Sequence, residues 1–180
     1  MIENLNKMST SNWTTVRQKA TQASNDIARQ AVMKFPDFLL KNGIITDEQY
    51  RRLIDRLAAT STHRPGYDVL LDEPVAGGAD GIVAEVKSNN PCAGSSFGSN
   101  QQTAIRKDLD TLTGLTSPKS DISIANHYKF LVLLDDGYGN VLAAIQKLIA
   151  SYNAAHSGCA QVVLWGSKPL NTADVFVVIL

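Results

Sequence analysis

The chain has 180 residues, 44% of them hydrophobic and 19% charged, which is the size and composition of one ordinary globular domain. Seventeen basic residues balance 17 acidic ones, and this excludes a disordered polyelectrolyte, a histone-like protein and an acidic solvating tail. There is no run of about 18 apolar residues and no apolar signal segment at the start, so we expect a protein that is neither membrane-spanning nor secreted. Two cysteines are too few for a disulfide framework and fit a reducing cytoplasm.

The balanced total conceals an asymmetry along the chain. Residues 1–66 carry ten basic and six acidic side chains, whereas residues 67–180 carry seven basic and eleven acidic ones. A positive segment joined to an acidic one suits a polyanion held beside a carboxylate metal site. A solvated basic face on a pair of amphipathic helices is the simpler alternative.

The first third of the chain predicts helices. Apolar residues recur at helical spacing over 12–35, and Pro36 is expected to end this helix, with a short helical turn following at 37–41. Thr46 and Gln49 form a capping box that starts a second helix, expected to end near residue 59. The apolar residues of the first helix are Trp13, Val16, Ala20, Ala23, Ile27 and Ala31.

After residue 60 the pattern indicates a mixture of strands and helices. Two apolar runs, 68–75 and 82–88, flank a glycine-rich turn and predict a β-hairpin. The elements expected beyond it are a helix at 100–112, a strand at 128–134, a helix at 141–154, and strands at 160–165 and 175–180. No repeat or low-complexity linker interrupts this order. We therefore expect one domain over 1–180, in which a helical segment (1–60) precedes a core of strands and helices (65–180).

Charged residues gather at the open end of the hairpin. Glu85 and Lys87 are two residues apart, so they leave the second strand on the same face. If the turn is centred near Gly78, Asp68 of the first strand falls opposite residues 87–89. Two carboxylates and an ammonium are then expected to converge there, with Glu85 and Lys87 at least partly exposed.

This combination of residue types suits phosphodiester hydrolysis. Neighbouring carboxylates repel each other unless a cation lies between them, and Mg²⁺ prefers such oxygens. Metal-bound water loses a proton more easily, and a nearby lysine helps to hold or deprotonate it. The alternative is a solvated hairpin with a cross-strand ion pair worth less than about 1 kcal/mol.

The order of these residues resembles the PD-(D/E)XK nuclease superfamily, which includes the type II restriction endonucleases. Sixteen residues separate Asp68 from Glu85-Val86-Lys87 on a hairpin, and the resemblance covers roughly residues 65–165. It implies an α/β fold with an αβββαβ core, in which helices flank a central mixed sheet after a helical N-terminal segment. It also implies that Asp68, Glu85 and the carbonyl of Val86 bind one or two Mg²⁺ ions and that Lys87 is the catalytic lysine.

One departure from the family pattern leaves the first ligand open. Pro65 lies three residues before Asp68 instead of next to it. Asp72 is four residues further on, is expected on the same face as Asp68, and therefore stays a rival for the same role.

Candidate DNA contacts lie on both sides of the hairpin. Arg52 and Arg56 are i, i+4 neighbours on the second helix and are expected to contact phosphates; the alternative is that the arginines of this helix pair with Glu48 and Asp55. Small polar residues after the hairpin lead into the helix at 100–112, whose N-terminus suits a phosphate. The candidates in this second region are Asn89, Asn90, Gln101 and Lys107.

The resulting hypothesis is a cytoplasmic, Mg²⁺-dependent endonuclease that cuts duplex DNA, most simply a type II restriction enzyme. A homodimer is expected, because two equivalent sites related by a two-fold axis cut both strands of a symmetric sequence. The alternatives are a repair or junction nuclease, an inactive nucleic-acid-binding or assembly protein on the same fold, and a plain interaction module.

Overall fold

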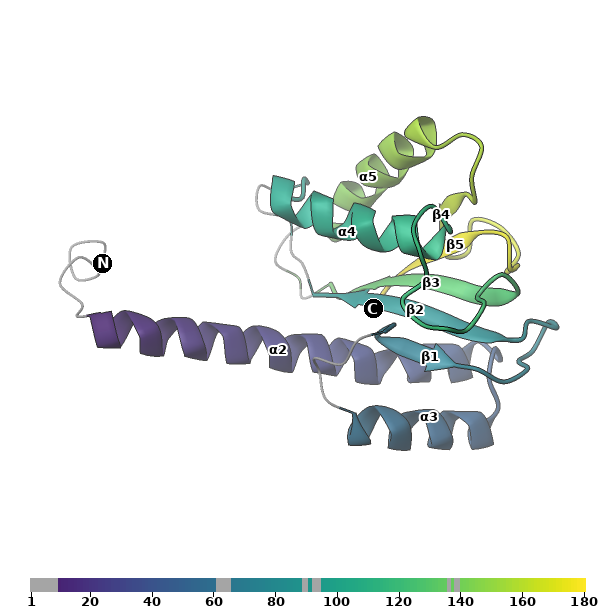
Figure 1. Cartoon of the computed structure of the whole chain (residues 1–180), viewed down its shortest axis with the longest axis horizontal. Helices are drawn as coiled ribbons and strands as arrows, with labels where there is room; N and C mark the ends of the chain where they lie inside the picture. The colour runs from purple at the N-terminus through teal and green to yellow at the C-terminus, as the bar shows by residue number, and fades with distance from the viewer. Residues whose placement is uncertain (1–9, 61–65, 89–90, 92–94, 136, 138–139) are drawn as a thin grey trace.

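The computed structural model describes residues 10–60, 66–88, 91, 95–135, 137 and 140–180. These residues form an α/β fold around a five-stranded sheet (Figure 1). The elements are α2 (Thr10–Lys41), α3 (Asp47–Ala59), β1 (Val69–Leu71), β2 (Gly81–Lys87), α4 (Ser99–Leu112), β3 (His127–Leu133), α5 (Val141–Ala155), β4 (Val162–Leu164) and β5 (Val175–Ile179).

The sheet is mixed, with strand order β1-β2-β3-β5-β4. β1 is antiparallel to β2, whereas β2, β3, β5 and β4 run parallel to one another. Val69 lies opposite Ala84, so Asp68, one residue earlier, faces Glu85 and not residues 87–89. The pairing is therefore shifted by three residues from the predicted register, and β1 is shorter than the predicted run of 68–75 because it ends at Leu71.

Helices cover both faces of the sheet: α4 and α5 lie on one face and α2 and α3 on the other (Figure 1). The side chains of β2 alternate between two cores, as a strand requires. Ile82, Ala84 and Val86 face the core under α2 and α3. Val83 faces the core under α4 and α5, and Glu85 and Lys87 follow it on that side.

Helix α2 continues through Pro36, where the sequence predicted it to end. A proline inside a helix removes one backbone hydrogen bond and costs about 3 kcal/mol. Phe35 and Leu39, on either side of it, are fully buried, and the Phe35 ring packs edge-on against Phe130 of β3 with centroids 5.3 Å apart. Burying two large apolar side chains offsets this cost, so the predicted break and the separate turn at 37–41 are wrong.

The remaining elements follow the predicted order. Thr46 and Gln49 form the expected capping box, with bonds of 3.2 and 3.0 Å between each side chain and the other residue's backbone. Two strands, not three, separate α3 from α4 in the described part of the chain, which differs from the αβββαβ order that the resemblance implies. No helix among the described residues is long and apolar enough to cross a membrane.

Candidate active site

Asp68 and Glu85 lie next to each other on neighbouring strands. Asp68 immediately precedes β1, and its Oδ2 accepts a hydrogen bond of 2.8 Å from the backbone amide of Val86. This bond holds the Asp68 carboxylate across from Glu85, because residues opposite each other in an antiparallel pair share a face. The structure therefore brings together Asp68 and Glu85, the two carboxylates expected from the sequence. The backbone amide of Val86 donates to Asp68.

Glu85 is buried, with only 2% of its side chain exposed. The pKa of Glu85 is raised to about 7, chiefly by burial; contact with Lys119 opposes this rise, and the nearby charges of Asp68 and Asp108 add to it. The expectation of a partly exposed Glu85 at an open strand end is wrong, because α4 and the segment after it cover this face of β2.

Two residues that the sequence did not single out complete the site. The Lys119 ammonium lies 2.8 Å from Oε1 of Glu85 and 2.9 Å from Oδ1 of Asp108. Asp108 reaches the site from α4, and its Oδ2 lies 2.6 Å from Nζ of Lys87. We call this group of Asp68, Glu85, Lys87, Asp108 and Lys119 the carboxylate site.

A signal for Asp108 was present in the sequence, but none for Lys119. Asp108 lies at helical spacing between Ile105 and Leu112, so it interrupts the apolar face of α4, and it is 5% exposed. A charged residue on a buried helix face needs a partner inside the fold. Lys119 lies in an irregular segment between α4 and β3, where no periodicity marks it.

The carboxylate site has oxygen atoms that are still short of hydrogen bonds. Oε1 of Glu85 and Oδ2 of Asp108 are buried, and although each lies close to a lysine, neither contact has hydrogen-bond geometry. Buried polar atoms of this kind normally find a partner. Mg²⁺ prefers hard carboxylate oxygens of this kind, and it needs only one or two of them together with water.

The carboxylate oxygens of the site are therefore of the type that binds Mg²⁺. They would supply one or two ligands, and water would supply the rest. Among the described residues, no group of three or more His, Cys, Asp or Glu side chains is arranged to hold a metal ion. Asp68 and Glu85 are the pair that the resemblance assigns to this role, and Asp108 adds a carboxylate that shares Lys119 with Glu85. In this structure the Lys119 ammonium is the cation that contacts Glu85.

Asp72 does not reach the carboxylate site. It follows the other end of β1, where its Oδ1 lies 3.3 Å from Nε2 of His127 at the start of β3. The structure thus separates the two rival first ligands by the length of β1, and places Asp68 beside Glu85.

Two of the three arginines of α3, Arg52 and Arg56, are held within the chain. Arg52 lies 2.5 Å from Glu48 and 2.8 Å from Glu73, and Arg56 donates a hydrogen bond of 3.0 Å to the carbonyl of Leu70. Helix α3 lies on the face of the sheet opposite to α4 (Figure 1). The pairing of Arg52 with Glu48 is the alternative that the sequence had left open.

The other candidate DNA contacts that the structure describes, Gln101 and Lys107, lie on α4. Oε1 of Gln101 accepts a hydrogen bond of 2.9 Å from the amide of Gly98, which caps the helix. Lys107 is exposed, one residue before Asp108. Asn89 and Asn90 lie outside the described residues.

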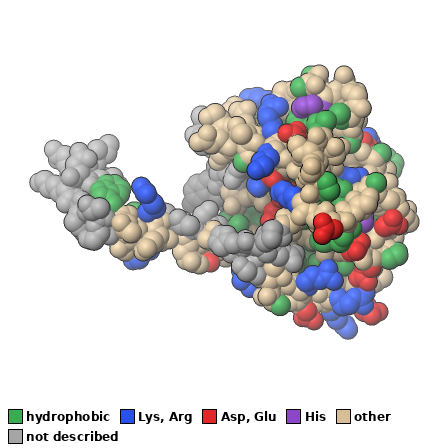
Figure 2. All heavy atoms as spheres, in the orientation of Figure 1, with side chains coloured by type: hydrophobic (Ala, Val, Ile, Leu, Met, Phe, Trp, Pro, Cys, Tyr) green, Lys and Arg blue, Asp and Glu red, His purple; other side chains and the backbone are tan. Residues whose placement is uncertain are grey.

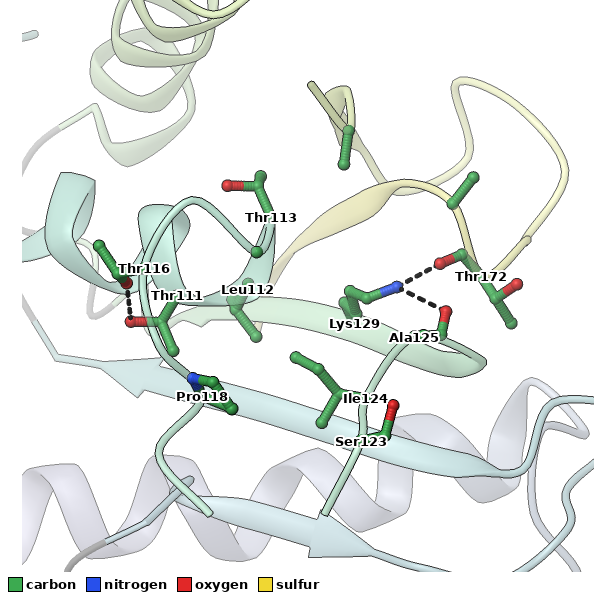
Figure 3. A pocket seen from close by; sticks show the side chains of 13 residues that line it. Thr111, Leu112, Thr113, Thr116, Pro118, Ser123, Ile124, Ala125, Lys129 and Thr172 are labelled. Carbon is green, nitrogen blue, oxygen red and sulfur yellow. Dashed lines mark hydrogen bonds between the residues drawn. The ribbon is translucent and has the colours of Figure 1, made fainter. Parts of the chain in front are cut away.

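A cavity of about 410 Å³ lies near the start of β3, away from Lys87 (Figure 3). Its charged residue is Lys129, which is 6% exposed and whose pKa is lowered by burial, against an opposing effect of Asp174. The Lys129 ammonium donates to the backbone carbonyls of Ala125, His127 and Thr172. These three acceptors match its three donors, so Lys129 ties the segment before β3 to the segment before β5.

Comparison with family models, curated proteins and solved structures finds no match to this chain. Function is therefore inferred from the geometry of the carboxylate site.

Proposed function

We propose that the chain is a Mg²⁺-dependent endonuclease that hydrolyses DNA phosphodiester bonds, on a fold similar to that of the PD-(D/E)XK nucleases. One observation carries the proposal: Asp68 and Glu85 face each other on adjacent strands, and Lys87 follows on the same face of β2. A chance D…ExK pattern on a solvated hairpin has no reason to be buried under a helix with a further acidic residue.

Each residue has a defined role in this proposal. Asp68 and Glu85, with the carbonyl of Val86, hold Mg²⁺, which would lower the pKa of a bound water and neutralise charge on the phosphate. The Lys87 ammonium, 24% exposed, orients the attacking water at the rim of the site. The water oxygen forms a bond to phosphorus and one water proton passes to solvent, while the bond from phosphorus to the leaving sugar oxygen breaks and that oxygen takes up a proton from solvent.

The proposed substrate is duplex DNA, cut at specific sites by a cytoplasmic restriction enzyme. Lys107 and Gln101, with Asn89 and Asn90, would supply DNA contacts from the α4 side of the sheet. A repair or junction nuclease would share the same metal site and differ in the DNA structures that it cuts.

A second candidate function is supported by the ion pairs of Lys119. Lys119 and Lys87 already neutralise Glu85 and Asp108. The same arrangement therefore suits an inactive DNA-binding or assembly protein, in which a lysine ammonium of the chain occupies the place of the metal ion. The two candidates differ in one property: only the nuclease binds a divalent cation at this site.

The test is cleavage of plasmid, phage and branched DNA with Mg²⁺ and with EDTA. We expect discrete fragments in Mg²⁺ only, and none from Glu85→Gln, Asp68→Asn or Lys87→Ala. Glutamine is chosen at position 85 because a truncation would leave a buried cavity. Asp72→Asn is the matched control and should keep full activity. Cleavage by Glu85→Gln, or none by the natural chain at any metal concentration, would refute the nuclease.

A further inference from the structure

The first half of α2 extends away from the rest of the molecule (Figure 1). Every residue from 13 to 19 is exposed, whereas Arg29 donates a hydrogen bond of 3.1 Å to the carbonyl of Ala58 and Ala31 is fully buried. Of the side chains that the structure describes between residues 13 and 28, none belongs to either hydrophobic core.

This extended segment carries an apolar face. Of the five most exposed large hydrophobic side chains in the described chain, three belong to it: Trp13 at 44%, Val16 at 43% and Ile27 at 40%. Their spacings of 3, 11 and 14 residues place them within one narrow stripe of a helix. Figure 2 shows apolar surface on this projection, apart from the body.

The apolar stripe has the 3.5-residue repeat of helices that pair in a coiled coil, in which the apolar residues form a seam between the two helices. In the sequence, alanines at 20 and 23 fall between Val16 and Ile27, so that apolar residue types alternate at steps of three and four. That 3.5-residue period keeps a seam facing a second helix, whereas a helix lying on a flat surface needs only the 3.6-residue period and a broader stripe.

A lone helix of this composition needs a partner to be stable in water. Thr14, Thr15 and Asn25 are weak helix formers, and helices without tertiary packing are marginal even with better residues. Packing along Trp13, Val16 and Ile27 would supply the missing stabilisation, because each of these side chains buries apolar area that is now in water.

We propose that the exposed half of α2 pairs with the same segment of a second copy of this chain, in antiparallel orientation. The charges beside the seam indicate the partner and the direction. Lys19 and Asp26 are both exposed and lie seven residues apart, about 10 Å along the axis, too far to pair within one helix. An antiparallel pair centred between residues 21 and 22 sets Lys19 of each copy beside Asp26 of the other.

The same arrangement matches the apolar residues. Val16 of each copy then lies level with Ile27 of the other, so the two larger aliphatic side chains pack twice by symmetry. A parallel pair in register leaves Lys19 and Asp26 a full heptad apart along the axis, without partners of opposite charge. Asp26 accepts a hydrogen bond of 2.9 Å from Gln22 in its own helix at Oδ1, which leaves Oδ2 to the lysine. This pairing does not depend on the proposed nuclease activity.

The test is sedimentation equilibrium of the full chain over a range of concentrations. We expect a dimer, and Ile27→Glu should raise its dissociation constant by roughly a hundredfold, because two buried isoleucines are lost and two charges enter the seam. Leu142→Glu is the matched control, since Leu142 is exposed by 47% on the body, and it should leave the dimer intact.

Charge exchange tests the orientation. Lys19→Glu and Asp26→Lys should each raise the dissociation constant by roughly tenfold, since two attractive pairs become repulsive, and the double variant should restore it. Circular dichroism checks that the variants remain helical.

Three outcomes would overturn the proposal. These are a natural chain that is monomeric at every concentration, a dimer that Leu142→Glu disrupts but Ile27→Glu does not, and a double variant no better than the single ones. A monomer that sediments with anionic phosphatidylserine vesicles would assign the stripe to a lipid surface instead.

Discussion

At the scale of single residues, the burial of Glu85 makes folding sensitive to pH. The pKa of Glu85 is about 7 in the folded chain and 4.5 in an exposed glutamate. Between these values the folded protein holds a proton that the unfolded chain has released, so this group lowers the free energy of unfolding as pH rises from 4.5 to 7, by at most about 3 kcal/mol.

The isosteric variant Glu85→Gln isolates this effect. We expect it to match the natural chain in stability near pH 4.5 and to exceed it above pH 7, because glutamine carries no charge to bury. Urea unfolding of both proteins across this range measures the difference, in which the titration of other groups cancels. Parallel stability curves would show that Glu85 does not titrate differently in the folded state.

Lys119 decides how strongly the carboxylate site attracts a metal. Burial disfavours its charge, but the contacts with Glu85 and Asp108 prevail and raise its pKa, so it stays an ammonium that competes with any second cation. We expect Lys119→Met to tighten Mn²⁺ binding, measured by calorimetry well above pH 7, by about tenfold or more.

Lys41→Met is the control for Lys119, because Lys41 is an exposed lysine at the end of α2. It should leave Mn²⁺ affinity unchanged. Equal affinity in all three proteins would mean that Lys119 does not compete with metal, and absence of binding in all three would favour the inactive DNA-binding protein.

At the scale of elements, Gly81 fixes how β2 enters the sheet. A Cβ at this position would lie 2.1 Å from the carbonyl oxygen of Leu71 on β1 and 2.8 Å from the ring of His127 on β3. We expect Gly81→Ala to lower the free energy of unfolding by about 2 kcal/mol or more, because backbone on one side and a buried ring on the other leave no room to relax.

Gly158→Ala is the matched control for Gly81→Ala, since nothing lies within 4 Å of a Cβ built at Gly158. Its stability should stay within about 0.5 kcal/mol of the natural chain. Denaturant unfolding of the two variants makes the comparison, and equal stabilities would mean that β2 shifts to admit the methyl group.

Helix α3 tests whether the basic N-terminal segment binds DNA. Arg52 and Arg56 are already engaged by two carboxylates and a backbone carbonyl, so we expect Arg52→Ala plus Arg56→Ala to leave the salt dependence of DNA binding unchanged in EDTA. Lys107→Ala should lower the slope of log affinity against log salt by roughly one unit. A lower slope for the double arginine variant and an unchanged slope for Lys107→Ala would instead assign the phosphate contacts to α3.

At the scale of the whole molecule, we expect the body to fold without the projecting half of α2. Both cores are built from residues 31 onward, so a chain that begins at Arg29 loses no buried side chain that the structure describes. We expect its free energy of unfolding to lie within about 0.5 kcal/mol of that of the monomeric Ile27→Glu variant. A larger loss, measured by urea unfolding, would show that the first half of α2 packs on the body after all.

The sequence by itself determined the elements and their order. Periodicity, the capping box at Thr46 and the glycine-rich turn are local patterns, so the sequence alone reveals them, apart from the break that it wrongly predicted at Pro36. For the same reason it determined that Glu85 and Lys87 share a face of β2, since that follows from the two-residue repeat of a strand.

Only the tertiary structure decided what lies around those residues. It continued α2 through Pro36, because packing of Phe35 and Leu39 against the sheet outweighs the local penalty. It chose Asp68 over Asp72 as the neighbour of Glu85 through the hairpin register, and it brought Lys119, 34 positions away in the sequence, to the same carboxylate. Burial then raised the pKa of Glu85 to about 7. Such contacts join segments that are distant along the chain, and no local pattern encodes which of them will meet.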